Sequence, residues 1–188
     1  TILITGGAGS FGKKFSEIVL KKFKIKKLII YSRDELKQFE MSKKLKKYQN
    51  IVRYLIGDIR DLQRLKFALN DVDIVVHAAA LKQVPSSEYN PFEVVKTNIL
   101  GTQNVVDACI ENKIEKVIAL STDKASSPTN LYGASKLMAD KLVIAANNYA
   151  NHKISKFSVV RYGNVMMSRG SVIPEFFEQK KTGKINIT

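Results

Sequence analysis

The stretch that decides the fold is Ile2-Leu3-Ile4-Thr5-Gly6-Gly7-Ala8-Gly9-Ser10-Phe11-Gly12. A short β-prone run leads into a glycine-rich turn, and apolar residues at helical spacing follow it as far as Phe23. The turn fits G-x-G-x-x-G, and glycines here let the backbone approach a pyrophosphate at the positive end of a helix. The stretch therefore predicts a dinucleotide site, with a glycine-rich turn without a ligand as the alternative. The residues expected to line this site are Gly6, Gly9, Ser10, Phe11 and Gly12.

Short β-rich runs alternate with helical stretches along the rest of the chain. Several runs are unbroken series of Val, Ile and Leu, which is typical of strands buried on both faces of a parallel sheet. Regular alternation predicts an α/β fold, a doubly wound parallel sheet of the Rossmann type with right-handed crossovers. Strands are expected at residues 2–5, 27–31, 52–56, 74–77, 116–121 and 157–161, and long helices at 90–112 and 130–149.

The ends of the sequence read as cuts within a longer protein. Thr1 already lies in a strand pattern without an initiator methionine, and residues 184–188 alternate polar and apolar like a new strand. We therefore expect residues 1–165 to form a cofactor-binding domain, and residues 166–188 to begin an incomplete substrate-binding region.

Composition excludes several classes of protein. Of the 188 residues, 45% are hydrophobic and 26% are charged, which excludes disordered and low-complexity chains. The single cysteine, Cys109, makes no internal disulfide and fits a reducing compartment, so we expect a cytoplasmic protein. The longest apolar runs fall short of the roughly 20 residues that span a bilayer, and no membrane association is expected. No metal site is expected either.

The chain is strongly basic, with 31 Lys and Arg against 17 Asp and Glu and a formal charge of +14. Such a charge raises the possibility of a nucleic-acid partner. The lysines, however, fall in helical segments whose other face is apolar, without interleaved aromatic residues to stack on bases. We interpret them as a solvated surface and expect no nucleic-acid binding.

The end of the second expected strand indicates which cofactor binds. NAD-binding proteins usually place a carboxylate there to hold the ribose hydroxyls, whereas this chain has Ser32 and Arg33. A hydroxyl and a guanidinium suit a 2′-phosphate, so we expect NADP. Asp34 and Glu35 follow directly, so NAD stays an alternative. A second alternative is that Arg33 only caps a solvated helix start and contacts no cofactor. Further cofactor contacts are expected from Asp58, Ile59, Ala78, Ala79 and Ala80.

A phenol and an ammonium stand four residues apart in Tyr132-Gly133-Ala134-Ser135-Lys136 and so share one helix face. The pair follows a strand that ends near Thr122, whose hydroxyl can hydrogen-bond a substrate hydroxyl. Tyr132 can exchange a proton with that hydroxyl, while Lys136 can lower the phenol pKa and hold the nicotinamide ribose. The alternative is a helix tyrosine beside a surface lysine.

Two further polar residues lie near these segments. Asn98 stands in the middle of an expected helix, where Asn is a poor helix former, so it either orders a group near the site or is structural. His77 ends an apolar run, and we interpret it as structural rather than catalytic.

With these residues, the chain resembles the extended short-chain dehydrogenase/reductase superfamily. Four segments are similar, more narrowly, to the configuration-inverting UDP-N-acetylglucosamine 4,6-dehydratases of bacterial pseudaminic acid and polysaccharide biosynthesis. The longer, retaining relatives typically carry methionine where this chain has Tyr132. The four segments are Tyr31-Ser32-Arg33-Asp34-Glu35-Leu36-Lys37-Gln38, Ala78-Ala79-Ala80-Leu81-Lys82-Gln83-Val84-Pro85, Ser121-Thr122-Asp123-Lys124-Ala125 and Val160-Arg161-Tyr162-Gly163-Asn164-Val165.

The resemblance implies a lyase that uses tightly bound NADP to make a 4-keto-6-deoxy UDP-sugar, with inversion at C5. Tyr132 would take the O4 proton, Lys124 the C5 proton, and Asp123 would protonate the departing C6 hydroxyl. A homo-oligomer would form through residues 90–112 and 130–149. The resemblance adds Lys37, Lys82 and Asn98 to the expected cofactor contacts, and it implies substrate contacts from Lys82, Tyr162, Gly163, Asn164 and Arg169.

Other functions stay open at this point. A UDP-sugar 4-epimerase or reductase of the same superfamily needs only Thr122, Tyr132 and Lys136, so the Asp123-Lys124 pair favours the dehydratase unless it is merely a solvated ion pair. A non-catalytic NADP-sensing regulator needs no intact proton-transfer set. Two departures from the dehydratase pattern bear on substrate fit: Met166-Met167 stands where a glycine is usual, and Gln83 where histidine is frequent.

Overall fold

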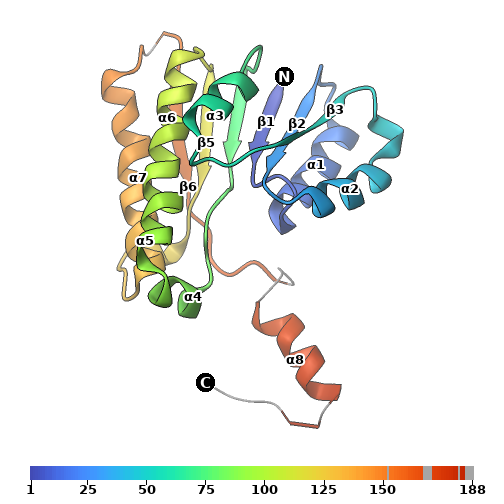
Figure 1. The fold of residues 1–188 in the computed structure, drawn as a ribbon, viewed down its shortest axis with the longest axis vertical. Coiled ribbons are helices and arrows are strands. Elements are labelled where there is room, and N and C mark those ends of the chain that lie inside the picture. The colour runs from blue at the N-terminus through green and yellow to red at the C-terminus, as the bar shows by residue number, and fades with distance from the viewer. Residues whose placement is uncertain (152, 167–170, 182, 185–188) are drawn as a thin grey trace.

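The computed structural model describes residues 1–151, 153–166, 171–181, 183 and 184. Its centre is a sheet of six parallel strands in the order β3-β2-β1-β4-β5-β6 (Figure 1). This arrangement confirms the predicted doubly wound α/β fold, and each strand lies within one residue of its expected bounds. The strands are β1 (Ile2–Thr5), β2 (Leu28–Ser32), β3 (Val52–Ile56), β4 (Ile74–His77), β5 (Lys116–Leu120) and β6 (Lys156–Val160).

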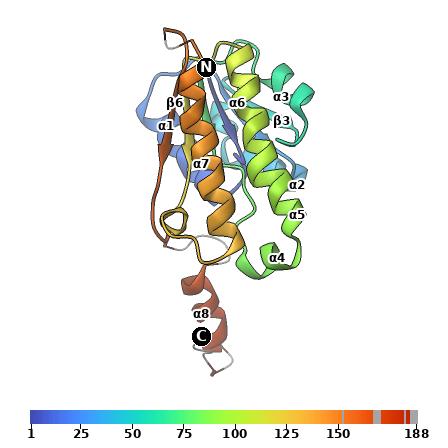
Figure 2. The same ribbon diagram turned by 90° about the vertical axis from the view of Figure 1, so that its left-hand side faces the viewer.

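Helices cover both faces of the sheet. Helices α1 (Ser10–Lys22) and α2 (Glu35–Lys44) lie on one face. Helices α3 (Leu62–Ala68), α6 (Gly101–Glu111) and α7 (Leu131–Tyr149) lie on the other, with α6 and α7 side by side (Figure 2). The shorter elements are η1 (Lys46–Tyr48), α4 (Val84–Tyr89), α5 (Pro91–Val94), η2 (Val95–Leu100) and η3 (Asp123–Ala125).

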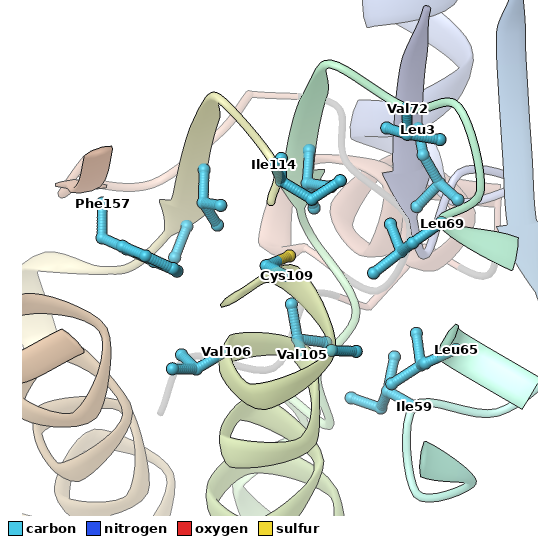
Figure 3. Packing of buried hydrophobic residues seen from close by; sticks show 14 of the residues in the cluster. Leu3, Ile59, Leu65, Leu69, Val72, Val105, Val106, Cys109, Ile114 and Phe157 are labelled. Carbon is cyan, nitrogen blue, oxygen red and sulfur yellow. The ribbon is translucent and has the colours of Figure 1, made fainter. Parts of the chain in front are cut away.

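Alternate residues of each strand build two separate cores, because successive side chains of a strand point to opposite faces. Leu3 of β1 packs into the core beneath α3, α6 and α7, and the next residue, Ile4, packs into the core beneath α1 and α2. Cys109 lies inside the larger core among Val105, Ile114 and their neighbours (Figure 3). Burial raises the pKa of the Cys109 thiol, so this residue acts as a small apolar side chain.

The expected helix at residues 90–112 is broken into parts. Residues of α5 lead into η2, a π-helical turn, before α6 continues the direction of the chain. Such turns are rare and frequently occur at functional sites. Asn98 lies in this turn and is buried.

Of residues 166–188, the structure describes α8 (Val172–Lys181) and a few flanking residues. Figure 1 shows α8 beyond the carboxyl ends of the strands, apart from the helices that cover the sheet. The division at residue 165 stays a prediction. Within the described part of the chain, no helix combines the length and apolarity required to cross a bilayer.

The tightest packing in the cofactor turn joins the start of α1 to Gly7, the second residue after β1. A Cβ added at Gly12 would lie 2.2 Å from the Gly7 carbonyl oxygen. Backbone atoms line this contact, so no side chain can move aside to make room.

We therefore expect Gly12→Ala to lower the free energy of unfolding by about 3 kcal/mol or more, because relief requires α1 to move away from the turn. Gly163→Ala is the matched control, since its added Cβ would have its nearest neighbour 4.0 Å away. Urea unfolding followed by circular dichroism measures both. Equal stability of the two variants would contradict the packing described here.

Candidate cofactor and proton-transfer site

The glycine turn runs from the carboxyl end of β1 to the start of α1. Gly6 has a φ of +64°, in the left-handed region, and a Cβ there would lie 2.9 Å from the Ala79 backbone. Gly9 is the N-cap of α1 and supplies no side-chain cap, so the first-turn N–H groups have no partner from that position. The turn thus brings the positive end of α1 close to the segment after β4.

A buried hydrogen-bonded cluster holds that neighbouring segment in place. The Thr5 hydroxyl accepts from the backbone N–H groups of Ala78 and Ala79, at 3.1 and 3.2 Å. The two ring nitrogens of His77 lie 2.7 Å from the Thr5 hydroxyl and 3.1 Å from the Thr102 hydroxyl. Burial, helped by Lys136, lowers the pKa of His77 to about 3 and keeps the ring neutral. His77 is therefore structural, as the sequence indicated.

Charged side chains gather where β2 and β3 end. Asp58 accepts hydrogen bonds from the Arg60 guanidinium at 2.7 and 2.9 Å, and Arg33 Nη1 lies 3.6 Å from the same carboxylate. Burial pushes the pKa of Asp58 upward, but the hydrogen bonds from Arg60 outweigh it and leave the pKa below its ordinary value. Asp58 is therefore ionised at neutral pH. Arg60 is a member of this cluster that sequence reasoning missed.

Other expected cofactor residues surround these groups. Lys37 pairs with Asp34, the N-cap of α2, and Ser32 accepts a hydrogen bond from Gln38 at 3.0 Å. Ile59 is buried in the larger core, where it packs beside Gly101. Lys82 is exposed.

Asn98 links the segment after β4 to α7. Its side-chain amide accepts from the Leu81 N–H at 2.8 Å and donates to the Leu81 carbonyl at 2.9 Å. It also donates to the Ser135 hydroxyl at 3.0 Å, and the residue is 1% exposed. Both amide hydrogens are used and the group is covered, so in this structure Asn98 positions neighbouring backbone. Its expected contact with a cofactor stays a prediction.

Helix α7 carries the phenol and the ammonium as predicted. Its N-cap Asn130 accepts from the Gly133 N–H at 2.9 Å, which starts the helix two residues before Tyr132. The Tyr132 phenol lies near the buried Thr122, whose hydroxyl donates to Asp123 Oδ1 at 2.9 Å. Lys136 is 5% exposed and donates to the Leu120 carbonyl at 2.7 Å.

Burial governs the charges of this pair. It lowers the pKa of Lys136 to about 8, although Asp140 on the next turn of α7 opposes the shift. Burial also raises the pKa of Tyr132, and the hydrogen bond from Thr122 only partly offsets this. The expected lowering of the phenol pKa is therefore reversed in the structure, where desolvation of the phenolate dominates.

The Thr122-Asp123-Lys124 segment forms the loop that follows β5. Lys124 Nζ lies 3.3 Å from Asp123 Oδ1 and donates to the Asn164 side chain at 3.1 Å. Hydrogen bonds from Thr122 and Lys124 lower the pKa of the Asp123 carboxyl. A Cβ at Gly163 would lie 4.0 Å from Asp123 Oδ2. Asn164 and Gly163 therefore adjoin the pair, and the exposed Tyr162 precedes them. Arg169 lies outside the described residues.

One family of known proteins matches nearly the whole chain. The family described as "Polysaccharide biosynthesis protein" matches residues 2–188. The chain belongs to this family. Its sheet order, its glycine turn and its Tyr132–Lys136 helix are those of the extended short-chain dehydrogenase/reductase superfamily.

Individual relatives carry more than one activity in their names. An inverting UDP-N-acetylglucosamine 4,6-dehydratase of Campylobacter jejuni is 62% identical over 175 residues, which cover 93% of this chain and 52% of that protein. A UDP-glucose 4-epimerase of Rickettsia typhi is 48% identical over 187 residues, covering 98% of this chain and 54% of that protein. The crystal structure of Pen from Bacillus thuringiensis has a TM-score of 0.92 and 45% identity, covering 100% of this chain and 57% of that one. The chain therefore spans about half the length of these relatives.

Sequence reasoning missed two charged residues near the site. They are Asp140 of α7 and Arg161, which directly follows β6. Asp140 is 3% exposed and accepts from Arg161 Nε at 2.8 Å. Its spacing from Lys136, four residues along the same helix, is a signal that could have identified it. No group of three or more potential metal-binding side chains occurs among the residues that the structure describes.

The buried Lys136 predicts a pH dependence of stability. Its pKa falls from 10.5 unfolded to about 8 folded because burial disfavours the charge. Between these values the unfolded chain binds the extra proton, so the contribution of Lys136 to stability rises with pH. We expect wild type to gain about 3 kcal/mol relative to Lys136→Met between pH 7 and pH 10. Urea unfolding of both proteins across this range measures the difference, and a constant difference would contradict it.

Proposed function

We propose that the full-length protein is a nucleotide-sugar 4,6-dehydratase that converts UDP-N-acetylglucosamine into a 4-keto-6-deoxy UDP-sugar with inversion at C5. The observation that carries the proposal is the exposed Asp123–Lys124 pair directly beside the buried Thr122, whose hydroxyl donates to Asp123 and lies near the Tyr132 phenol. A reductase has no use for this second acid and base. The name of the Campylobacter relative supports the same activity.

The glycine turn and the ends of β2 and β3 fit a nicotinamide dinucleotide. The uncapped start of α1 suits a pyrophosphate, and the ionised Asp58 suits the adenine amine. Arg33 is 53% exposed and only loosely paired, so its guanidinium is free to turn toward a 2′-phosphate. We therefore propose NADP, with NAD as the alternative. When bound, a nicotinamide would supply the reversible hydride acceptor that oxidation at sugar C4 and reduction at C6 require.

Tyr132 and Thr122 act on the O4 hydroxyl of the sugar. Thr122 lies near the phenol, so that Thr122 can orient the substrate oxygen while Tyr132 accepts its proton. Lys136 lies four residues further along α7, tied to the Leu120 carbonyl, and its proposed role is to stabilise the resulting phenolate by its charge.

Lys124 and Asp123 act on C5 and C6. At rest they form an ion pair with 3.3 Å between Nζ and Oδ1, and the proposed elimination requires the form in which the proton lies on Asp123 and the Lys124 amine is neutral. The amine then takes the C5 proton, while the acid protonates the C6 hydroxyl, which leaves as water. These two transfers restore the original ion pair, so elimination requires no net proton from solvent.

A UDP-sugar 4-epimerase is the second candidate, because the Rickettsia relative is named as one. That reaction uses Thr122, Tyr132 and Lys136, and it gives the Asp123–Lys124 pair no catalytic role. The two functions therefore differ in what the loss of Lys124 does.

We also propose a homo-oligomer formed through the face that α5, η2, α6 and α7 present. Large apolar side chains are exposed along α5, η2 and α7 and on the adjoining α4, and Figure 2 shows α6 and α7 together on this side. These side chains are Tyr89, Phe92, Leu100, Met138, Ile144 and Tyr149. The proposed substrate and the proposed subunit contacts both concern the full-length protein.

Lys124→Ala in the full-length enzyme should separate the two half-reactions. The Tyr132 step does not need Lys124, so mixing with UDP-N-acetylglucosamine should still give a rise in absorbance of reduced nicotinamide. Loss of water and uptake of solvent deuterium at C5 should stop, as followed by NMR. Tyr132→Phe should suppress the first absorbance change, and Lys141→Ala, an exposed lysine of α7, should behave as wild type. Conversion of the UDP-sugar to its C4 epimer, without loss of water and at the same rate in wild type and Lys124→Ala, would favour the epimerase.

Arg33→Ala should weaken NADP and leave NAD nearly unchanged. The loss of one charge-assisted contact to a phosphate predicts a fall of roughly 10–150-fold in NADP affinity. Calorimetric titration of the apoprotein with each cofactor measures this. Arg53→Ala, at an exposed arginine of the edge strand β3, is the control and should change neither affinity. Equal losses for the two cofactors would show that Arg33 does not read the 2′-phosphate.

A further inference from the structure

The loop that carries Asp123 and Lys124 has a second attachment besides β5. The chain that leaves β6, at residues 161–164, contacts this loop three times along its length. The contacts are Asp123 N–H to the Tyr162 carbonyl at 3.0 Å, Arg161 Nη1 to the Ser126 hydroxyl at 3.2 Å, and Lys124 Nζ to the Asn164 side chain at 3.1 Å. The position of the loop therefore follows the position of residues 161–164.

Arg161 joins this strand exit to α7 as well. Its Nε donates at 2.8 Å to Asp140 Oδ2, and the Asp140 side chain is 3% exposed. Tyr132, Lys136 and Asp140 follow one another at four-residue intervals, so the helix face that ends in this ion pair begins with the proposed proton acceptor. One guanidinium thus bridges the helix of the hydride step and the loop of the elimination step.

The charge of Asp140 makes this bridge firm. A buried carboxylate needs a charged partner, because an unpaired charge in the interior costs several kcal/mol. The charged or titratable groups that face Asp140 are Arg161, which directly follows β6, and its own neighbours on α7, Lys136 and Tyr132. Arg161 alone forms an ion pair with it among the described residues, so the guanidinium cannot swing away without leaving the charge unpaired.

We propose that the Arg161–Asp140 ion pair is a positioning device that fixes the Asp123–Lys124 loop relative to Tyr132 and Lys136, so that the substrate oxidised at C4 meets the C5 base without rearrangement. This inference rests on the proposed dehydratase function for its kinetic consequence. Its structural consequence, a loop held rigid by Arg161, does not depend on the function.

The fold supplies a matched control at the opposite end of the same two elements. Asn147 of α7 donates to the Phe157 carbonyl at 2.9 Å and accepts from the Phe157 N–H at 3.0 Å. This bridge also ties α7 to β6, but it lies at the start of β6, away from the loop. A role in stability alone would make the two bridges equivalent.

Three variants of the full-length protein test the proposal. Asp140→Asn combined with Arg161→Gln removes the ion pair without leaving a buried charge. Ser126→Ala removes only the contact between Arg161 and the loop, at an exposed residue that does not threaten folding. Asn147→Ala removes the control bridge. Thermal melting identifies any variant that fails to fold, in which case Ser126→Ala decides the outcome.

The first readout is hydrogen exchange of the Asp123 amide in the apoprotein. We expect it to quicken by roughly 10-fold or more in the double variant, the equivalent of one lost charge-assisted hydrogen bond, and by a smaller factor in Ser126→Ala. Asn147→Ala should leave it unchanged. An Asp123 amide that stays as protected as in wild type in both loop variants would overturn the proposal.

The second readout is the ratio of C4 oxidation to C5 deuterium uptake after mixing with UDP-N-acetylglucosamine. Loss of positioning should slow deuterium uptake by about 10-fold more than C4 oxidation in the double variant, and should leave the ratio unchanged in Asn147→Ala. An equal fall of both steps in the double variant would overturn the kinetic role. If wild type oxidises no sugar at C4, the proposed function fails, and amide exchange alone decides whether Arg161 holds the loop.

Discussion

Parallel pairing of β1 with β2 on one side and β4 on the other determines where every functional group lies. The chain order of the strands reverses at β1, so the segments after β1 and β4 lead to helices on opposite faces, which is where ligands bind in such sheets. The Thr5 hydroxyl at the end of β1 holds the Ala78 and Ala79 amides after β4, which ties the two segments together at the carboxyl edge. Loops after β5 and β6 reach the same edge, and they bring the proton-transfer residues to the cofactor turn.

Local sequence was enough to predict the strands, the glycine turn and the helix with Tyr132 and Lys136, because each depends on spacing within about 20 residues. The contacts of Asn98 could not be read in this way. Its partners Leu81 and Ser135 are 17 and 37 residues away, and only the packed fold shows that its amide is already used. The same holds for Arg161 and Asp140, which are 21 residues apart. The direction of the Tyr132 pKa shift was wrong for a related reason, since spacing predicts neighbours but not burial.

Charged side chains are more exposed where β2 and β3 end than along α7. Where β2 and β3 end, Asp58 and its arginines remain partly open to solvent, which suits a cluster that must accept a charged ligand. Along α7 the charges are enclosed, with Lys136 and Asp140 both nearly inaccessible. Burial of the Lys136 charge lowers the free energy of unfolding at neutral pH, yet it strengthens electrostatic effects on a neighbouring phenol. This cost falls on α7, where the proton transfer is proposed.

The π turn between α5 and α6 has a consequence for how this site can change over evolutionary time. A π turn holds one residue more than an α turn, and each added residue rotates the remainder of the helix by about 100°. The extra residue lets Asn98 face the loop after β4 while Val105 and Cys109 keep their places against the sheet. A one-residue deletion in this turn would therefore misalign either the amide or the core, whereas substitutions on the exposed side of α6 are free of this constraint. The fold therefore constrains the length of this segment as well as its composition.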